Sequence, residues 1–187
     1  MSEQRNILLS IAYDGTDYSG WQRQDGRPGI RTIQGTIEGA LAKIHGYPPS
    51  LSGSGRTDSG VHARSQRANF FSPIASMGAE RFTPALNGLL PPDIRITGAE
   101  EVPPSFHARF DARWRTYRYF FIPRRILPHE SRYALPLRRQ PDLALLNGYC
   151  RLLRGEYDCT VFAAGNRGRD GSPFRYIYGA SFFMEAG

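Results

Sequence analysis

The order of periodic segments in the first half of the chain constrains the fold more than any other feature. Residues 7–13 (ILLSIAY) place apolar side chains at every second position, which predicts a strand. A helical pattern follows, with Thr32 as its cap and Gly46 as its end. Its apolar residues form a single stripe that comprises Ile33, Ile37, Ala40, Leu41 and Ile44.

The pattern continues with two further strands, a second helix and a closing strand. The two strands are expected near residues 50–53 and 66–71, and the closing strand spans 94–102. Thr83 and Pro84 have the residue types of a cap and a first helical position, which predicts a helix that begins there. The order β-α-β-β-α-β is that of the ferredoxin-like split motif.

The second half of the chain repeats the first part of this pattern. Residues 115–122 predict a strand, 142–154 a helix that ends at Gly155, 158–162 a short strand and 174–184 a longer one. A Gly-rich basic loop is expected at 165–173. The predicted class is therefore α+β, with two ferredoxin-like halves at 1–104 and 105–187, the second incomplete by one helix and one strand.

The charge of the chain favours a nucleic-acid partner. The net charge is +7, and Lys43 is the only lysine among 24 basic residues. Arginine makes bidentate contacts to phosphate and stacks on bases, although a basic surface without a partner is the alternative. Two cysteines provide no disulfide framework, no apolar run is long enough for a membrane span, and the N-terminus lacks a signal-peptide pattern.

The loop at 52–66 (SGSGRTDSGVHARSQ) carries the candidate catalytic group. It places Asp58 between Arg56 and His62 in a glycine-rich segment that matches neither a P-loop nor a dinucleotide-binding motif. Asp58 has the chemistry of a nucleophile or base whose ionised form Arg56 supports, and an Asx turn is the alternative. Trp21 lies in another polar, Gly-rich segment and is expected to be exposed.

The motif GRTDSGVHA at 55–63 resembles the signature GRTDAGVHA of the tRNA pseudouridine synthase A family. Further blocks are similar to those of the family and occur in the same order along the chain: YDGTDYSGWQRQ, TIQGTIEGALAKIHG, ALNGLLPPDIRI, FHARFDARWRTYRYF and LLRGEYDCTVF. The resemblance extends over roughly residues 7 to 184.

The resemblance implies an isomerase that converts uridine to pseudouridine in the anticodon stem-loop of tRNA, without metal or organic cofactor. Asp58 would be the essential carboxylate, acting by attack on the ribose or by removal of a ribose proton. Arg56 would assist the flipping of the nucleotide. Tyr117 would pack on the flipped base, with Tyr119 as the alternative.

Other residues in these blocks are expected to contact RNA or to support the loops. His62 and His107 are expected to support loops, and His45, His62, His107 and His129 lack metal-ligand spacing. The family also implies a cytoplasmic homodimer with no membrane association. Candidate phosphate contacts are Arg23, Arg64, Arg109 and Arg115, together with Arg113, Arg118 and the loop 167–171.

The sequence departs from the family pattern after residue 184. Family members continue into a strand and helix whose basic residue pairs with the catalytic aspartate, so an uncovered sheet edge or apolar face is expected here. The first alternative function is therefore a tRNA-binding relative without activity. The second is an aspartate-dependent hydrolase, which would need another carboxylate or a metal beside Asp58.

Overall fold

The computed structural model describes residues 4–26, 29–162 and 173–185, and the chain forms two compact units. Unit 1 is Met1–Tyr117 and unit 2 is Arg118–Gly187. The domain division after residue 104 that the sequence predicts stays a prediction. In the described ranges, no helix combines the length and apolar character needed to cross a membrane.

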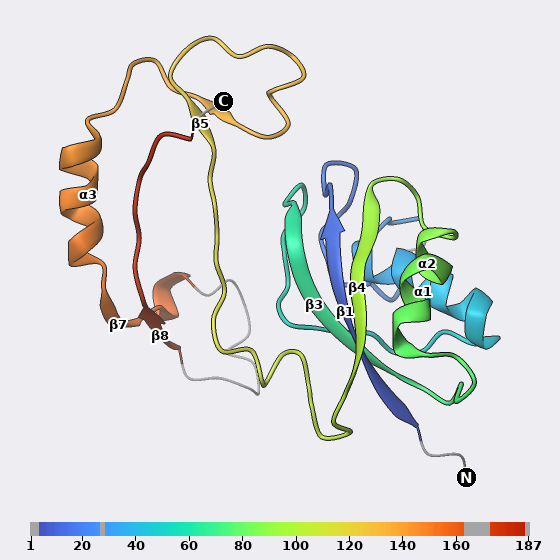
Figure 1. The fold of residues 1–187 in the computed structure, drawn as a ribbon. Helices are drawn as coiled ribbons and strands as arrows, with labels where there is room; N and C mark the ends of the chain where they lie inside the picture. The colour runs from blue at the N-terminus through green and yellow to red at the C-terminus, as the bar shows by residue number, and fades with distance from the viewer. Residues whose placement is uncertain (1–3, 27–28, 163–172, 186–187) are drawn as a thin grey trace. The chain divides into compact units, whose positions relative to one another are not determined.

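Unit 1 has the element order that the sequence predicts, β-α-β-β-α-β, and builds one four-stranded sheet. The strand order is β2-β3-β1-β4, and every neighbouring pair is antiparallel. Helices α1 and α2 cover one face of this sheet (Figure 1). The elements are β1 (Arg5–Tyr13), α1 (Ile33–His45), β2 (Ser52–Gly53), β3 (Ala63–Ser72), a 3-10 turn (Ala79–Arg81), α2 (Phe82–Asn87) and β4 (Ile94–Val102).

The core of unit 1 lies between the sheet and its helices. Alternate side chains of β1 are buried there, as the two-sided alternation of a strand predicts. The predicted stripe of α1 also packs there, with Ile44 partly buried and its other four residues buried. Thr32 caps α1 by accepting a hydrogen bond from the Gly35 N–H at 3.2 Å, and Gly46 ends it with φ +78°. The prediction for α1 is therefore confirmed at both ends.

The predicted start of the second helix is wrong. The helix begins at Phe82, after a 3-10 turn, so Thr83 lies inside it and caps nothing. Phe82 is fully buried, and its ring meets those of Phe70 and His45. Burial of this ring in the core, rather than the local cap signal, sets where the helix begins.

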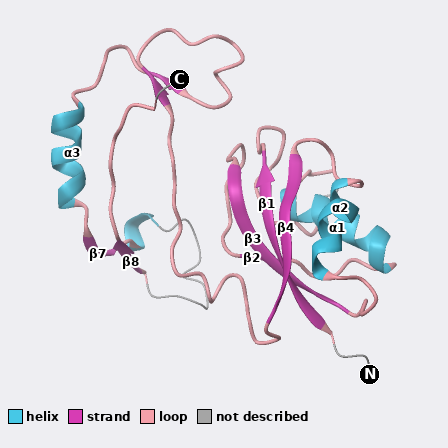
Figure 2. Ribbon diagram, in the orientation of Figure 1, coloured by secondary structure: helices cyan, strands magenta, loops and turns pink. Residues whose placement is uncertain are grey.

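Unit 2 contains one helix and two short strand pairs among its described residues (Figure 2). Strand β5 (Phe121–Ile122) pairs in parallel with β6 (Leu135–Pro136). Strand β7 (Gly155–Asp158) pairs antiparallel with β8 (Phe174–Ile177). Helix α3 (Leu143–Leu152) begins after Asp142, whose carboxylate accepts a hydrogen bond from the Leu145 N–H.

Three strand predictions for the second half of the chain are wrong in extent. Among the described residues, 115–120 form no ladder, and the last strand pairs over β8 rather than over all of 174–184. The strand expected at 158–162 lies earlier, at β7, because the Asp158 carboxylate accepts a hydrogen bond from the Thr160 N–H and turns the chain into a 3-10 turn (Thr160–Phe162). Most of the loop predicted at 165–173 lies outside the described residues.

Candidate active site

Asp58 lies at the tip of the loop that joins β2 to β3. The Val61 N–H donates to the Asp58 carbonyl at 3.2 Å, which closes a turn over residues 58–61. Gly60 occupies the third position of the turn with φ +78°, where a side chain is disfavoured. The turn is closed by the backbone of Asp58 and not by its carboxylate, so it is not the Asx turn considered as an alternative.

The Asp58 side chain is exposed and has no partner among the described residues. No hydrogen bond or ion pair of its carboxylate occurs in that part of the chain, and none joins it to Arg56. Arg56 is exposed as well. The carboxylate and the guanidinium are therefore both accessible to a ligand from solvent.

A second loop, of which residues 14–26 and 29–31 are described, packs directly on the Asp58 loop. The Trp21 N–H donates to the Thr57 carbonyl at 2.9 Å, and the Tyr18 carbonyl accepts from the Ser59 hydroxyl at 3.0 Å. Gly20 comes so close that a Cβ there would lie 2.6 Å from the Thr57 carbonyl oxygen. Two sequence blocks that are separate along the chain therefore form one structural unit around Asp58.

Trp21 is buried, with 1% of its surface exposed, so the expectation of an exposed tryptophan is wrong. Its indole lies against Gly53, where a Cβ would fall 2.6 Å from the ring, and 6.1 Å from the ring of Tyr13. The polar composition around Trp21 was a misleading indication because its burial depends on β2, which lies far along the sequence. The sequence did contain a signal for this burial, because several aromatic residues within one Gly-rich segment indicate that the segment packs against the core.

His62 connects the end of the Asp58 loop to the second loop. Its Nδ1 accepts a hydrogen bond from the Gly15 N–H at 3.2 Å and lies 3.0 Å from Oδ1 of Asp14. A bond to the carboxylate requires a proton on Nδ1, whereas a bond from Gly15 requires a lone pair there, so only one forms at a time. In either case His62 supports the loop, as expected.

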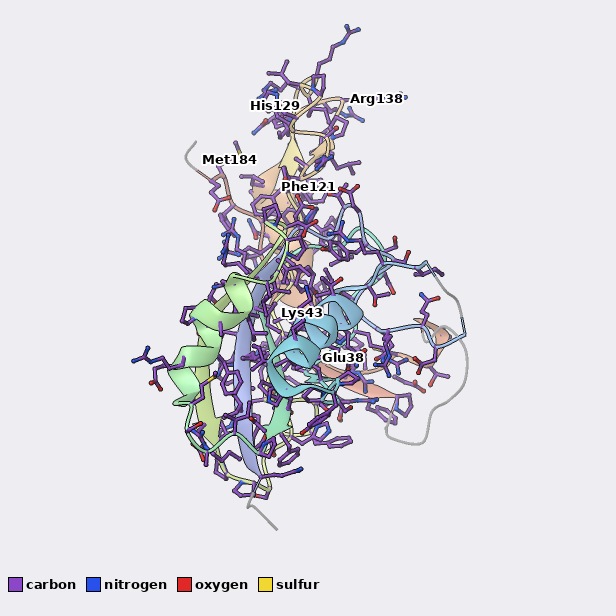
Figure 3. The ribbon with its side chains drawn as sticks, turned by 90° about the vertical axis from the view of Figure 1, so that its right-hand side faces the viewer. Glu38, Lys43, Phe121, His129, Arg138 and Met184 are labelled. Atoms are coloured by element: carbon purple, nitrogen blue, oxygen red, sulfur yellow. The ribbon has the colours of Figure 1, made fainter. Side chains whose placement is uncertain are left out.

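Two of the arginines predicted to contact phosphate, Arg23 and Arg115, form bonds within unit 1. Arg23 forms ion pairs with Glu38 on α1 at 2.5 Å and with Asp25 at 3.0 Å (Figure 3 shows Glu38). Glu38 is almost fully buried, so Arg23 has a structural role as the ion-pair partner of a buried carboxylate. The guanidinium of Arg115 donates to the Ser54 carbonyl, which places Arg115 at the base of the Asp58 loop.

The remaining predicted site residues are exposed. Arg109 lies with its guanidinium carbon 5.8 Å from the centre of the Phe110 ring. Arg64 is an exposed residue of β3. Tyr117 is 73% exposed, and no hydrogen bond or ring contact of Tyr117 occurs within the described ranges.

Two buried asparagines fix the segment that leads to Arg115. Asn6 donates to the carbonyls of Pro103 and Phe106, at 3.1 and 2.8 Å. Asn69 donates to the Asn6 side chain and accepts from the Ala108 N–H, each at 2.9 Å. This network attaches the block at 103–111 to the central strands, and no pattern in the sequence predicts it.

The described residues contain no cluster of three or more side chains of the types that bind metal ions.

Residues 9–111, which contain the Asp58 loop and the loop that packs on it, match the family model described as tRNA pseudouridine synthase. The chain belongs to this family. It is 53% identical to the tRNA pseudouridine synthase A of Treponema denticola, with 97% of this chain and 69% of that protein aligned. The corresponding protein of Treponema pallidum is 46% identical, over 97% of this chain and 66% of its own length.

A more distant relative gives the same result. The tRNA pseudouridine synthase A of Caldicellulosiruptor bescii is 42% identical over 97% of this chain and 72% of that protein. The chain therefore spans about two thirds of the length of the curated relatives that it matches.

Proposed function

We propose that this chain isomerises uridine to pseudouridine in tRNA, with Asp58 as the catalytic carboxylate. The observation that carries the proposal is an exposed aspartate, without a partner among the described residues, whose loop packs on a second loop within the residues that match the family. Such an arrangement presents a carboxyl oxygen to a substrate while restricting the motion of the backbone behind it.

The reaction requires no oxidant and no external group. The bond between N1 of uracil and the ribose breaks, the base rotates, and a new bond forms between its C5 and the same ribose carbon. The proton on C5 is lost and N1 gains a proton, so the atoms balance. Asp58 serves either as the nucleophile at the ribose or as the base that removes a ribose proton.

The residues around Asp58 suit a flipped nucleotide. A uridine in a stem has to leave the stack before a protein group reaches its sugar. Arg56 lies two residues before Asp58, is exposed, and takes the role of filling the vacated space. Tyr117, also exposed, takes the role of stacking on the base. Phosphate contacts are assigned to Arg64, Arg109 and Arg115, and to Arg23 with less support because of its carboxylate partners.

The proposal extends to the substrate region and the state of the protein. We assign the anticodon stem-loop as the target, a homodimer as the working form, the cytoplasm as its location, and two ferredoxin-like halves as its fold. The names of the relatives support a tRNA substrate. The finer assignments rest on the family resemblance of the sequence blocks.

Position mapping on an unmodified tRNA transcript tests the proposal. Incubation with the 187-residue chain is expected to yield pseudouridine within the anticodon stem-loop, and a transcript with cytidines in place of those uridines is expected to yield none. Pseudouridine elsewhere contradicts the assigned target. Tight binding of both transcripts without any product supports the alternative, a tRNA-binding protein that does not isomerise uridine.

A further inference from the structure

We propose that Tyr13 is a positioning residue for this reaction. Its hydroxyl forms a hydrogen bond with Oγ1 of Thr57, and through that bond it sets the direction in which Asp58 projects. The inference rests on the proposed function, because it assigns a role in a reaction at Asp58. The inference can be tested separately from the proposed function, since the effect on the loop is measurable without turnover.

The direction of the Asp58 carboxylate depends on its backbone. In the part of the chain that the structure describes, no side-chain hydrogen bond or ion pair holds the carboxylate itself. An exposed side chain without partners takes its mean direction from its Cα–Cβ bond. The groups that fix the peptide on either side of Asp58 therefore decide where its oxygens lie.

The residues after Asp58 and the residue before it are held by different groups. Ser59 and Gly60 bond to the carbonyl of Tyr18, at 3.0 and 3.4 Å. Thr57, the residue before, bonds through its carbonyl to the Trp21 N–H at 2.9 Å and through its hydroxyl to Tyr13 at 2.8 Å. The bond from Tyr13 is the side-chain restraint on the peptide that enters Asp58.

Thr57 is well suited to transmit such a restraint. Its branched Cβ restricts χ1, so a bond that fixes Oγ1 also fixes the Cα–Cβ direction of the residue. With the carbonyl bonded to Trp21, both the side chain and the following peptide of Thr57 have defined directions. A threonine held only through its carbonyl would retain rotation that shifts the next residue.

Tyr13 provides a rigid origin for this bond. It is the last residue of β1, an inner strand of the sheet, and is paired with Ala63 of β3 and Ile94 of β4. Its surface is only 5% exposed, and burial raises the pKa of its phenol, so the hydroxyl keeps its proton.

The strand pairing next to Tyr13 is irregular in the way expected beside a functional site. Ile11 pairs with Gln66, whereas Tyr13 pairs with Ala63, so the register shifts between them. A bulge of this kind redirects a side chain relative to a regular ladder. Ile11 and the earlier core residues of β1 are purely apolar, and Tyr13 is the position at which a hydroxyl reaches the loop.

Two isosteric variants and their combination test the inference. Tyr13→Phe and Thr57→Val each remove one hydroxyl and keep the shape of the side chain. Each is expected to lower kcat about ten-fold with KM for tRNA changed by less than about two-fold, since the loss is one of geometry at the reacting group. The double variant is expected to be no slower than either single one. Thr57→Ser keeps the hydroxyl but loses the branched Cβ, so it is expected to lose less activity than Thr57→Val.

Hydrogen exchange supplies the readout that is independent of turnover. The amides of Trp21 and Val61, which bond to Thr57 and Asp58, are expected to exchange faster in Tyr13→Phe than in the wild type. The amide of Gly46 at the end of α1 is expected to be unchanged. Tyr47→Phe, at a half-exposed tyrosine beside His45, is the matched control and is expected to alter neither rate nor exchange.

The outcomes separate this inference from the proposed function. Faster exchange with a wild-type kcat shows that the bond is structural and overturns the positioning role. Additive losses in the double variant overturn the transmission through Thr57. A wild-type chain that binds tRNA without turnover contradicts the proposed function, and unchanged exchange in Tyr13→Phe then separately overturns the restraint on the loop.

Discussion

Replacement of Gly20 by alanine tests how closely the two loops of the site depend on each other. A Cβ at Gly20 would lie 2.6 Å from the Thr57 carbonyl oxygen and 3.2 Å from the Asp58 carbonyl carbon. The Thr57 carbonyl would have to move by roughly 0.9 Å to reach an ordinary separation. The backbone at Gly20 also has φ +87°, which costs an L-residue about 1–2 kcal/mol.

The two effects together predict a loss of roughly 2–4 kcal/mol in the free energy of unfolding and a Tm lowered on the order of 10 °C. Because the displaced atoms precede and include Asp58, pseudouridine formation by the folded variant is expected to fall about 100-fold. Thermal unfolding and a timed tRNA assay below the lowered Tm measure the two quantities.

Gly39→Ala is the matched control. Gly39 is an exposed residue of α1, and nothing lies within 4 Å of the position that a Cβ would take there, so alanine is expected to stabilise the helix by up to about 1 kcal/mol with full activity. A Gly20→Ala protein with wild-type Tm and wild-type rate would refute the reasoning, because it would show that the loop pair tolerates separation.

Two further predictions concern the asparagine network and unit 2. Asn69→Ala removes a partner from the Ala108 N–H and from the Asn6 side chain, so the free energy of unfolding from urea titration is expected to fall by about 1–3 kcal/mol; an unchanged value contradicts the network. In unit 2, hydrogen bonds from the Arg124 guanidinium and the Leu127 N–H lower the pKa of Glu130 to about 2 from its ordinary 4.5. The stabilisation is complete above pH 4.5 and lost as the pH falls toward 2, so Arg124→Gln is expected to destabilise at neutral pH but not at pH 2, and to raise the Glu130 midpoint in a carboxyl NMR titration.

The parts of the fold that the sequence predicts well are those where local signals and burial agree. For α1, the Thr32 cap, the apolar stripe and Gly46 all indicate the same helix, and the structure has it. For β4, alternation predicts residues 94–102, which are the bounds observed. At α2 the cap signal of Thr83 conflicted with the burial of Phe82, and burial decided the start of the helix.

Strand pairing in the second half of the chain was less predictable for a physical reason. Alternation shows that a segment favours an extended backbone, but a ladder also requires a partner strand in register. Residues 115–120 have the alternation but form no ladder with any described segment. Leu135–Pro136 lacked a clear signal and pairs with β5. The described residues of unit 2 are also poorly buried, with Cys150 the one buried side chain among them.

The candidate site, like the fold, could be predicted from the sequence only in part. Asp58 and Arg56 were identifiable because one short motif contains both residues. The contacts that hold Asp58 were not, because they join residues far apart in the sequence, such as Tyr13 and Thr57, which are separated by 44 positions. Hydrogen bonds of this kind follow from the tertiary fold and leave no periodic pattern.

The most direct test of the central claim compares the wild-type chain with Asp58→Asn in single-turnover formation of pseudouridine, with tRNA affinity measured on the same samples. Asp17→Asn, which changes another exposed carboxylate in the adjoining loop, is the control. The account predicts product from the wild type and from Asp17→Asn, and none from Asp58→Asn at unchanged tRNA affinity. Product from Asp58→Asn at the wild-type rate would contradict the assignment of Asp58 as the catalytic carboxylate.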